Sequence, residues 1–292
     1  MRQWGRAMHT DPSPSPRKRL QVGLVAALWR YPVKSMMGEE LNSSDITDRG
    51  LLGDRQWAVV DRVTGKIGGA KNPRKWGNFF DFRAAYSEPP QAGAVMPSAR
   101  ITLPNGAGVT TGQGDLDQVL SRAFGRDVTL EEARSDEKSQ GATAEEYWLD
   151  MAGLDNRDTV TDFEMPAGTL FDTAVVHLLT TATIDHLRAL YPQGRFEPRR
   201  FRPNIVISVP GEDQGFVEND WVGRTLTIGG NVRLEITEPC PRCVMTTLPQ
   251  GDLPKDSGIL RTAAQHNGVN VGVYASVVSG GTIRRGDAVA LA

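Results

Sequence analysis

The residues best suited to chemistry are the chain's two cysteines, which stand three positions apart in Cys240-Pro241-Arg242-Cys243. A thiolate is both a nucleophile and a strong ligand for a soft metal. Arg242 adds a guanidinium, which stabilises a neighbouring thiolate and offers a planar fork of N–H donors to an anionic group. The motif therefore indicates a place where a thiolate and an anion-binding cation lie side by side.

Several uses of a CxxC pair compete for this motif. A thioredoxin-type redox pair needs its first cysteine at a helix N-terminus, whereas the β-branched residues of Val244–Thr247 predict an extended run. A structural zinc site needs two further cysteines or histidines at ligand spacing, but the sequence has no other cysteine, and His177 stands in an apolar run typical of a hydrogen-bonded core residue. Four-cysteine iron–sulfur ligation is excluded by count. A thiolate that binds a soft metal, with the other cysteine as a packed neighbour, and a buried inert pair both stay open.

Cationic side chains recur beside predicted turns and strand ends, where an anionic ligand would meet them. A basic loop residue by itself usually indicates only a solvated surface, so no single one of them carries weight. The sequence contains no P-loop, no GxGxxG fingerprint and no GxSxG nucleophile elbow. The cations in question are Lys34, Arg55, Arg74 and Arg202, the last of which ends a basic loop with Arg195, Arg199 and Arg200.

The elements that would position these residues are mainly strands. Apolar and β-branched runs separated by glycine turns recur about every ten residues in the second half of the chain, a spacing typical of a barrel. Helical spacing with start and stop signals predicts two short helices, at 116–124 and 181–190. The predicted strands include 21–32, 174–179, 204–208, 225–228, 232–236, 269–278 and 288–291.

The run from Glu131 to Ala167 is polar and acidic without clear periodicity, which predicts a connector or lid with a domain boundary inside it. We therefore expect a disordered leader over 1–19, one domain over 20–145 and a second over 146–292. The leader contains SPSP and no apolar core, so it does not resemble a signal peptide. The predicted fold class is mainly β (α+β).

Composition excludes several classes of protein. The 292 residues carry a formal net charge of only -2 with both signs interspersed, so no nucleic-acid-binding tract is expected. Two cysteines this close together cannot form a disulfide framework, which points to a reducing, cytoplasmic location. The longest apolar runs are far shorter than the roughly 20 residues of a membrane helix, so no membrane partner is expected.

Five motifs in order resemble the MOSC family, whose members are related to the C-terminal domain of molybdenum cofactor sulfurase. The N-terminal part is similar to the β-barrel domain that precedes it in the mitochondrial amidoxime reducing component and its bacterial relatives. The resemblance runs from about Gln21 to the C-terminus. The motifs are Tyr31-Pro32-Val33-Lys34-Ser35, Gly50-Leu51-Leu52-Gly53-Asp54-Arg55, Phe201-Arg202-Pro203-Asn204, Cys240-Pro241-Arg242-Cys243 and Gly280-Gly281-Thr282-Ile283-Arg284-Arg285-Gly286-Asp287.

The resemblance implies a MOSC β-barrel with a few short helices and an N-terminal β-barrel-like domain. It also implies a molybdenum–molybdopterin cofactor whose metal is held by the second cysteine, so Cys243 is expected as metal ligand and catalytic residue. One departure is Pro241, which replaces a hydroxyl residue of the family pattern. The residues expected to bind the cofactor are Lys34, Ser35, Arg55, Thr173, Arg202, Asn204 and Arg242.

The resemblance predicts a molybdenum-dependent oxidoreductase that reduces small N-hydroxylated compounds by removing oxygen from an N–O group. Because no ferredoxin domain follows the MOSC-like part, a separate ferredoxin or flavin reductase is expected as electron donor. The alternative is a protein that binds the molybdenum cofactor, or carries sulfur as a persulfide on Cys243, without reductase turnover. A barrel that has lost its ligand and serves as an interaction domain is a third possibility.

Overall fold

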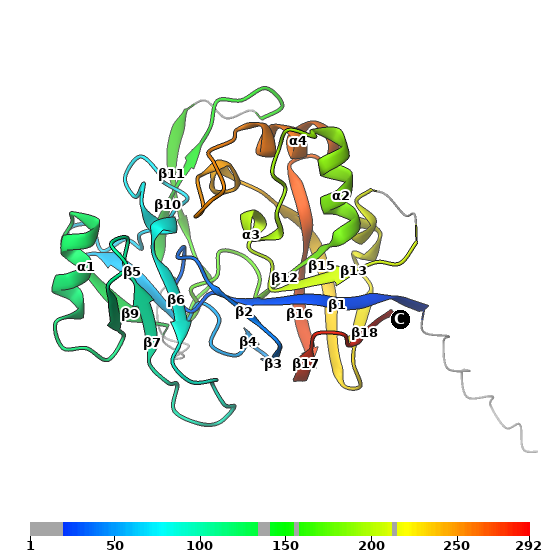
Figure 1. Cartoon of the computed structure of the whole chain (residues 1–292), viewed down its shortest axis with the longest axis horizontal. Helices are drawn as coiled ribbons and strands as arrows, with labels where there is room; N and C mark the ends of the chain where they lie inside the picture. The colour runs from blue at the N-terminus through cyan, green and yellow to red at the C-terminus, as the bar shows by residue number, and fades with distance from the viewer. Residues whose placement is uncertain (1–19, 134–140, 155–157, 212–214) are drawn as a thin grey trace, which may run out of the picture.

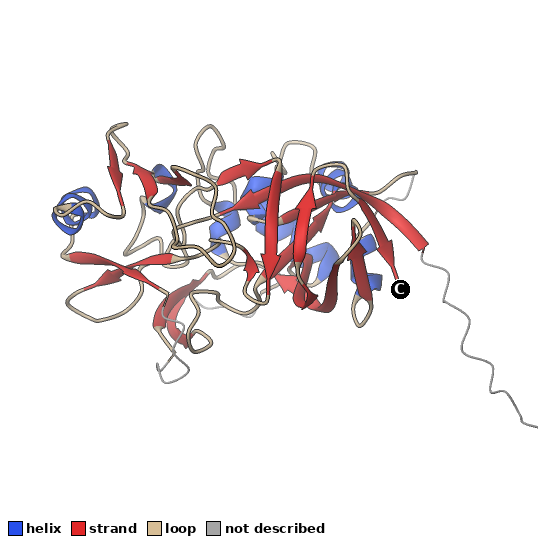
Figure 2. Cartoon of the chain, turned by 90° about the horizontal axis from the view of Figure 1, so that it is seen from below, coloured by secondary structure: helices blue, strands red, loops and turns tan. Residues whose placement is uncertain are grey.

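The computed structural model describes residues 20–133, 141–154, 158–211 and 215–292, and the leader predicted over 1–19 lies outside these ranges. A group of small sheets with helix α1 lies at the left of Figure 1, and a barrel with helices α2, α3 and α4 lies at the right. Figure 2 shows strands running through both halves with the helices beside them. The mainly β fold class is therefore confirmed.

Within the described residues, seven strands close into a barrel in the order β13-β12-β16-β15-β14-β18-β1, because β1 also pairs with β13. Strand β2 extends the sheet beyond β1. Alternate apolar side chains such as Leu28, Leu178 and Ile236 are buried inside, as expected where successive side chains face opposite sides of a strand. The bounds are β1 Leu20–Arg30, β2 Glu39–Leu41, β12 Val176–Thr180, β13 Ile205–Ser208, β14 Thr225–Ile228, β15 Val232–Pro241, β16 Asn270–Ser279 and β18 Ala288–Leu291.

The N-terminal part contains smaller sheets around a second, aromatic core. The rings of Phe82 and Phe124 stack with centroids 4.3 Å apart, and Trp76 meets Phe124 edge-on. Strand β5 pairs with β9, β6 with β7 and β8, and β3 with β4 and β17. The bounds are β3 Ser43–Thr47, β4 Gly50–Leu51, β5 Trp57–Asp61, η1 Phe79–Asp81, β6 Arg83–Tyr86, β7 Ala99–Thr102, β8 Gly108–Thr110, α1 Leu116–Phe124, β9 Val128–Glu132 and β17 Gly281–Arg284.

The two halves share strands. Strand β1, from the N-terminal end of the chain, lies between β13 and β18 in the barrel and crosses the centre of Figure 1 in blue. Strand β17, from the C-terminal end, pairs with β3. The predicted division into 20–145 and 146–292 stays a prediction, and a cut there would separate β1 from its barrel neighbours.

Part of the run predicted as a connector is instead a β-hairpin. Strands β10 (Thr143–Trp148) and β11 (Thr159–Glu164) pair antiparallel, with Ala144 opposite Phe163 and Trp148 opposite Thr159. Residues 134–140 and 155–157 lie outside the described part of the chain. The hairpin carries charged residues on both faces, so the apolar and polar alternation that normally reveals a strand is missing.

The helices follow their capping signals. Helix α2 (Thr181–Leu190) begins where the Thr180 hydroxyl accepts the Thr183 N–H at 3.1 Å, and α1 ends at Gly125 with φ 65°. No helix in the described ranges has both the length and the apolarity to span a bilayer. Two further helices were not predicted, α3 (Pro198–Phe201) and α4 (Gly258–Asn267). The 3-10 segment η2 covers Val217–Trp221.

The extended run predicted after Cys243 is wrong. Residues Val244–Thr247 form a 3-10 turn, η3, with Cys243 at its N-cap position. The Thr246 N–H and hydroxyl both donate to the Cys243 carbonyl, at 3.2 and 3.0 Å. These local hydrogen bonds outweigh the extended preference of the β-branched residues.

Candidate functional site

A cavity of about 260 Å³ is lined by both halves of the chain and by the β10–β11 hairpin. Segments that lie more than 200 positions apart in the sequence meet there. Their roles as ligands stay predictions, but the structure brings every predicted site residue to this one cavity. These residues are Lys34, Ser35, Arg55, Thr173, Arg202, Asn204, Arg242 and Cys243.

Three of these residues have left-handed backbone conformations. Ser35 has φ 66°, Arg55 φ 48° and Arg202 φ 54°. A side chain in this region costs about 1 kcal/mol or more relative to ordinary backbone, and such residues gather where surrounding structure enforces them. Each lies at a turn beside the cavity. The surrounding structure holds the strained backbone in place, and the side chains line the cavity.

Arg55 and Arg202 lie on the ring of one tyrosine. Their guanidinium carbons are 4.6 and 4.1 Å from the centroid of the Tyr31 ring. Burial raises the pKa of the Tyr31 hydroxyl to about 12, so it stays neutral at physiological pH. Burial, and then the charge of Arg55, lower the pKa of Arg202 to about 10, which still leaves Arg202 charged. The aromatic face partly compensates the repulsion between two buried cations.

Asp54 fixes several of these groups. Its buried carboxylate accepts the Tyr31 N–H at 2.7 Å and the Asn204 side-chain amide at 2.8 Å, and it pairs with the Arg55 guanidinium. The Asn204 side-chain oxygen in turn accepts a hydrogen bond from the backbone N–H of His177 at 3.1 Å. Asp54 was not predicted as a site residue, although its place directly before Arg55 in the sequence was a usable signal.

Arg242 lines the cavity and has one buried donor without a partner among the described residues. Its Nη2 donates to the Phe201 carbonyl at 2.8 Å, and its Nη1 contacts the sulfur of the buried Cys240. Its Nε is buried and has no hydrogen-bond partner among the described residues. Cys240, expected only as a packed neighbour, therefore also orients this guanidinium.

Two lysines that line the cavity share one carboxylate, that of Asp172. Lys34 Nζ donates to the Leu170 carbonyl at 2.8 Å and pairs with Asp172. Lys71 Nζ lies 3.2 Å from both an Asp172 oxygen and a Glu146 oxygen. Burial lowers the pKa of Lys34. Burial disfavours charge on Asp172 as well, but Lys34 and Lys71 hold the pKa of its carboxyl below the ordinary 3.8. Asp172 and Lys71 were missed in the sequence because neither stands in a resemblance motif.

Family models match both halves of the chain. A MOSC domain covers residues 167–290, and a MOSC N-terminal beta barrel domain covers residues 22–79. The chain belongs to the MOSC family. Of the predicted site residues, Lys34, Ser35 and Arg55 fall in the N-terminal match and the other five in the MOSC domain. The β10–β11 hairpin lies outside both matched segments.

Individual relatives of this MOSC chain include two mammalian proteins. It is 27% identical over 263 residues to mitochondrial amidoxime reducing component 2 of Rattus norvegicus, covering 85% of this chain and 72% of that one. It is 28% identical over 250 residues to mitochondrial amidoxime-reducing component 1 of Homo sapiens, covering 80% and 69%. Among solved structures, the YUAD protein from Bacillus subtilis matches 94% of this chain and 97% of its own with 11% identity and a TM-score of 0.47.

Cys243 of this MOSC domain contributes the cavity's thiol. Burial raises its pKa to about 11, while the Lys71 ammonium lowers the pKa and the Glu146 carboxylate raises it. The thiol is therefore protonated at neutral pH, and binding a metal cation would displace that proton. In the described ranges, no three His, Cys, Asp or Glu side chains are grouped as a metal-ion site.

Proposed function

We propose that this MOSC protein is a molybdenum-cofactor-dependent reductase that removes oxygen from N-hydroxylated compounds. The observation that carries the proposal is the cavity, where the thiol of Cys243 lies among buried guanidinium and ammonium groups from both halves of the chain. The names of the mammalian relatives, amidoxime reducing components, supply the reaction class.

The residues present fit a phosphorylated pterin that carries molybdenum. Arg242 Nε is a buried donor without a partner among the described residues, and such a donor is costly unless a ligand accepts from it. Arg55 and Arg202 place two further guanidinium groups at the same cavity, and guanidinium forks match phosphate geometry. A cysteine thiolate is the ligand type that suits a soft metal. When bound, the cofactor would supply the two-electron chemistry.

The protein's own groups would bind and orient. Arg55, Arg202 and Arg242 would hold the anionic part of the cofactor, and Cys243 would lose its proton to become the metal ligand. Asp54 would keep Arg55 and Asn204 in place through the contacts described above. The overall reaction takes two electrons and two protons, breaks the N–O bond and releases water. We infer that the electrons come from a separate ferredoxin or flavin reductase.

Amidoxime turnover tests this function. Protein made in a host that synthesises the molybdenum cofactor should reduce benzamidoxime to benzamidine with a chemically reduced dye as electron donor. Cys243→Ala should abolish this activity, whereas Glu164→Gln, a change of an exposed carboxylate, should leave it unchanged. Absence of turnover by the wild-type protein, combined with a mass increase of about 32 Da on Cys243 that marks a persulfide, would support sulfur carriage and overturn the reductase.

A further inference from the structure

The β10–β11 hairpin presents a distinct face to the cavity. Glu146 and Trp148 of β10, two residues apart, and Phe163 of β11 all line it. Alternate residues of a strand point to the same side, and the register sets Trp148 opposite Thr159 and Ala144 opposite Phe163. The cavity face of the hairpin therefore combines the Glu146 carboxylate with two aromatic rings, and Glu145 of the other face also borders the cavity.

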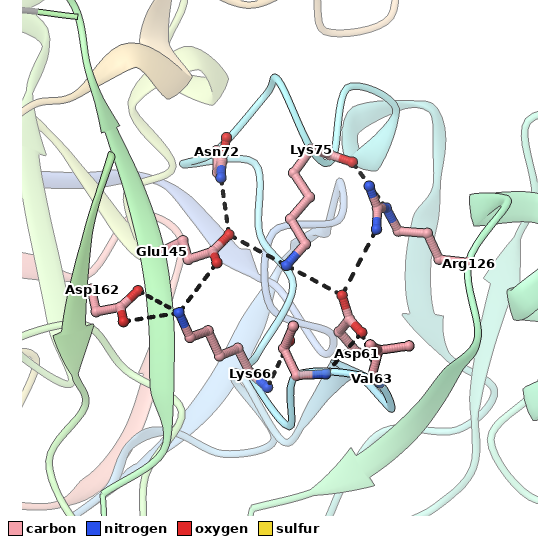
Figure 3. Close-up of polar contacts among 9 residues, drawn as sticks. Asp61, Val63, Lys66, Asn72, Lys75, Arg126, Glu145 and Asp162 are labelled. Atoms are coloured by element: carbon pink, nitrogen blue, oxygen red, sulfur yellow. Dashed lines mark hydrogen bonds and ion pairs between the residues drawn. The ribbon is translucent and has the colours of Figure 1, made fainter. Parts of the chain in front are cut away.

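The opposite face of the hairpin is fixed to the N-terminal half by ion pairs, which Figure 3 shows. Glu145 and Asp162, directly opposite each other in the register, both contact the Lys66 ammonium, at 3.3 and 2.7 Å. Lys75 lies 3.4 Å from Glu145 and 3.2 Å from the buried Asp61. These contacts hold the hairpin in place, so its cavity face has a fixed position. We call this face the wall.

The side chains of this wall are themselves held in position. The Trp148 indole N–H donates to the Thr161 hydroxyl at 2.7 Å, which leaves the partly exposed ring face free for contact. The Lys71 ammonium lies 4.6 Å from the centre of the Phe163 ring and 3.2 Å from Glu146 Oε2. Lys71 donates to one Glu146 oxygen, Oε2, and the Glu146 side chain lines the cavity, so the second carboxylate oxygen can accept from a ligand.

The cavity is also divided by charge. Arg55, Arg202 and Arg242 lie on the side formed by the barrel and the N-terminal turns, whereas Glu146 belongs to the hairpin. An anionic group is attracted to the guanidinium groups, whereas Glu146 offers an acceptor to N–H donors of a ligand, with the Lys71 ammonium 3.2 Å from its Oε2.

We propose that the cavity face of the β10–β11 hairpin is the substrate-recognition wall, and that it selects planar, unsaturated amidine-type substrates. Trp148 packs against the flat body of the substrate, and Glu146 accepts hydrogen bonds from the amidine nitrogens. This inference rests on the proposed reductase function and adds the residues that determine its specificity. It also fits the position of the hairpin outside both matched family segments.

Binding of benzamidine, the cationic product, tests the wall without any turnover. Titration calorimetry should show that Glu146→Gln weakens benzamidine binding about tenfold or more, because a charge-assisted hydrogen bond is lost. Binding of neutral acetophenone, which has no N–H donor, should change less than about twofold, because it makes no such bond. Trp148→Ala should weaken both ligands. The matched control is Glu164→Gln, which alters an exposed carboxylate paired opposite Thr143 on the same hairpin.

Turnover gives a second readout. Benzhydroxamic acid has a carbonyl where benzamidoxime has an amino group. The ratio of kcat/KM for benzamidoxime to kcat/KM for benzhydroxamic acid should fall about tenfold in Glu146→Gln. Lys71 keeps its contact with Asp172 in this variant, and Glu146→Asp, which retains the charge, should partly restore the ratio. Thermal unfolding confirms that each variant is folded.

The outcomes separate the two proposals. If the wild-type protein reduces neither substrate but Glu146→Gln still weakens benzamidine binding selectively, the reductase fails and the wall stands. If the wild-type protein reduces benzamidoxime and Glu146→Gln leaves both benzamidine affinity and the substrate ratio unchanged, the wall fails. Equal losses for both ligands and both substrates would also overturn it, because they indicate a structural role through Lys71.

Discussion

At the scale of single residues, Asp54 positions several of the groups that surround the cavity. It is the shared partner of Arg55, Asn204 and the Tyr31 backbone, and it is almost completely buried. When a buried guanidinium loses its carboxylate partner, the free-energy cost of removing the guanidinium from water is no longer compensated by the ion pair.

Asp54→Asn should therefore lower the free energy of unfolding by roughly 3 kcal/mol. Urea unfolding of the two proteins measures this loss. Asp185→Asn breaks an exposed pair with Arg188 and should cost less than about 1 kcal/mol. Equal stability of Asp54→Asn and the wild-type protein would show that Arg55 does not need this carboxylate.

His177 predicts a dependence of stability on pH. Burial, and then the charge of Arg242, lower its pKa from 6.5 to about 3 in the folded protein. The unfolded chain binds the proton first, so this contribution is complete above pH 6.5 and is lost as pH falls toward 3, at up to roughly 1.4 kcal/mol per pH unit. Urea unfolding between pH 7 and about 4 should show this slope, and His177→Gln should reduce it. An unchanged slope in the variant would assign the effect to other groups.

The basic loop shows what sequence reasoning resolves about single residues and what it does not. Composition identified a cationic loop, and the family motif singled out Arg202. The sequence could not show that Arg195 and Arg199 pair with Asp252 at the surface, or that Arg200 is fully buried. Side-chain direction there depends on the short helix α3 and on the left-handed backbone at Arg202, which no residue pattern specifies.

At the scale of elements, Arg200 joins the loop that carries Arg202 to the turn that follows Cys243. Its guanidinium donates to the carbonyls of Thr246, Leu248 and Pro254, at 3.3, 3.2 and 2.8 Å. These carbonyls belong to η3 and the chain after it. Arg200 thus positions the two segments relative to each other without reaching the cavity.

Arg200→Lys should keep the charge but lose part of this fork, which costs roughly 1–3 kcal/mol for unsatisfied carbonyls. The variant should also bind less molybdenum than the wild-type protein, because Cys243 and Arg202 are no longer held in a fixed position relative to each other. Unfolding and metal analysis measure the two effects, with Arg261→Lys, on an exposed position of α4, as control. Full metal content in a destabilised Arg200→Lys would contradict the positioning role.

Elements with both periodicity and caps were predicted best. Helices α1 and α2 have the predicted bounds, because helical spacing agrees with a capping residue at one end of each, Gly125 after α1 and Thr180 before α2. Helix α4 was missed although Gly268 ends it in the left-handed conformation. Turn η3 and the β10–β11 hairpin were misread, because local hydrogen bonds in the first and charge on both faces in the second hide the usual patterns.

At the scale of the whole molecule, the barrel depends on the N-terminal end of the chain. Strand β1 pairs with both β13 and β18, and without it those two strands would be open edges. Sequence periodicity revealed the strands of the barrel but not this closure, because no local pattern specifies which distant strands pair.

Residues 146–292 expressed alone should therefore aggregate or stay unfolded. Appending residues 20–42 through a short linker after Ala292 should restore folding, because β18 and β1 are antiparallel neighbours. Circular dichroism and size-exclusion chromatography distinguish the outcomes. A folded, monomeric 146–292 fragment would show that the second domain does not need β1.

The cavity brings both halves of the chain together around the Cys243 thiol, and we propose that this thiol binds molybdenum. The most direct measurement is the molybdenum and pterin content of the wild-type protein and of Cys243→Ala, both purified from a host that makes the cofactor. We expect the wild-type protein to contain both, and Cys243→Ala to lose most of its molybdenum. A wild-type protein without molybdenum, or a Cys243→Ala protein with the full amount, would contradict it.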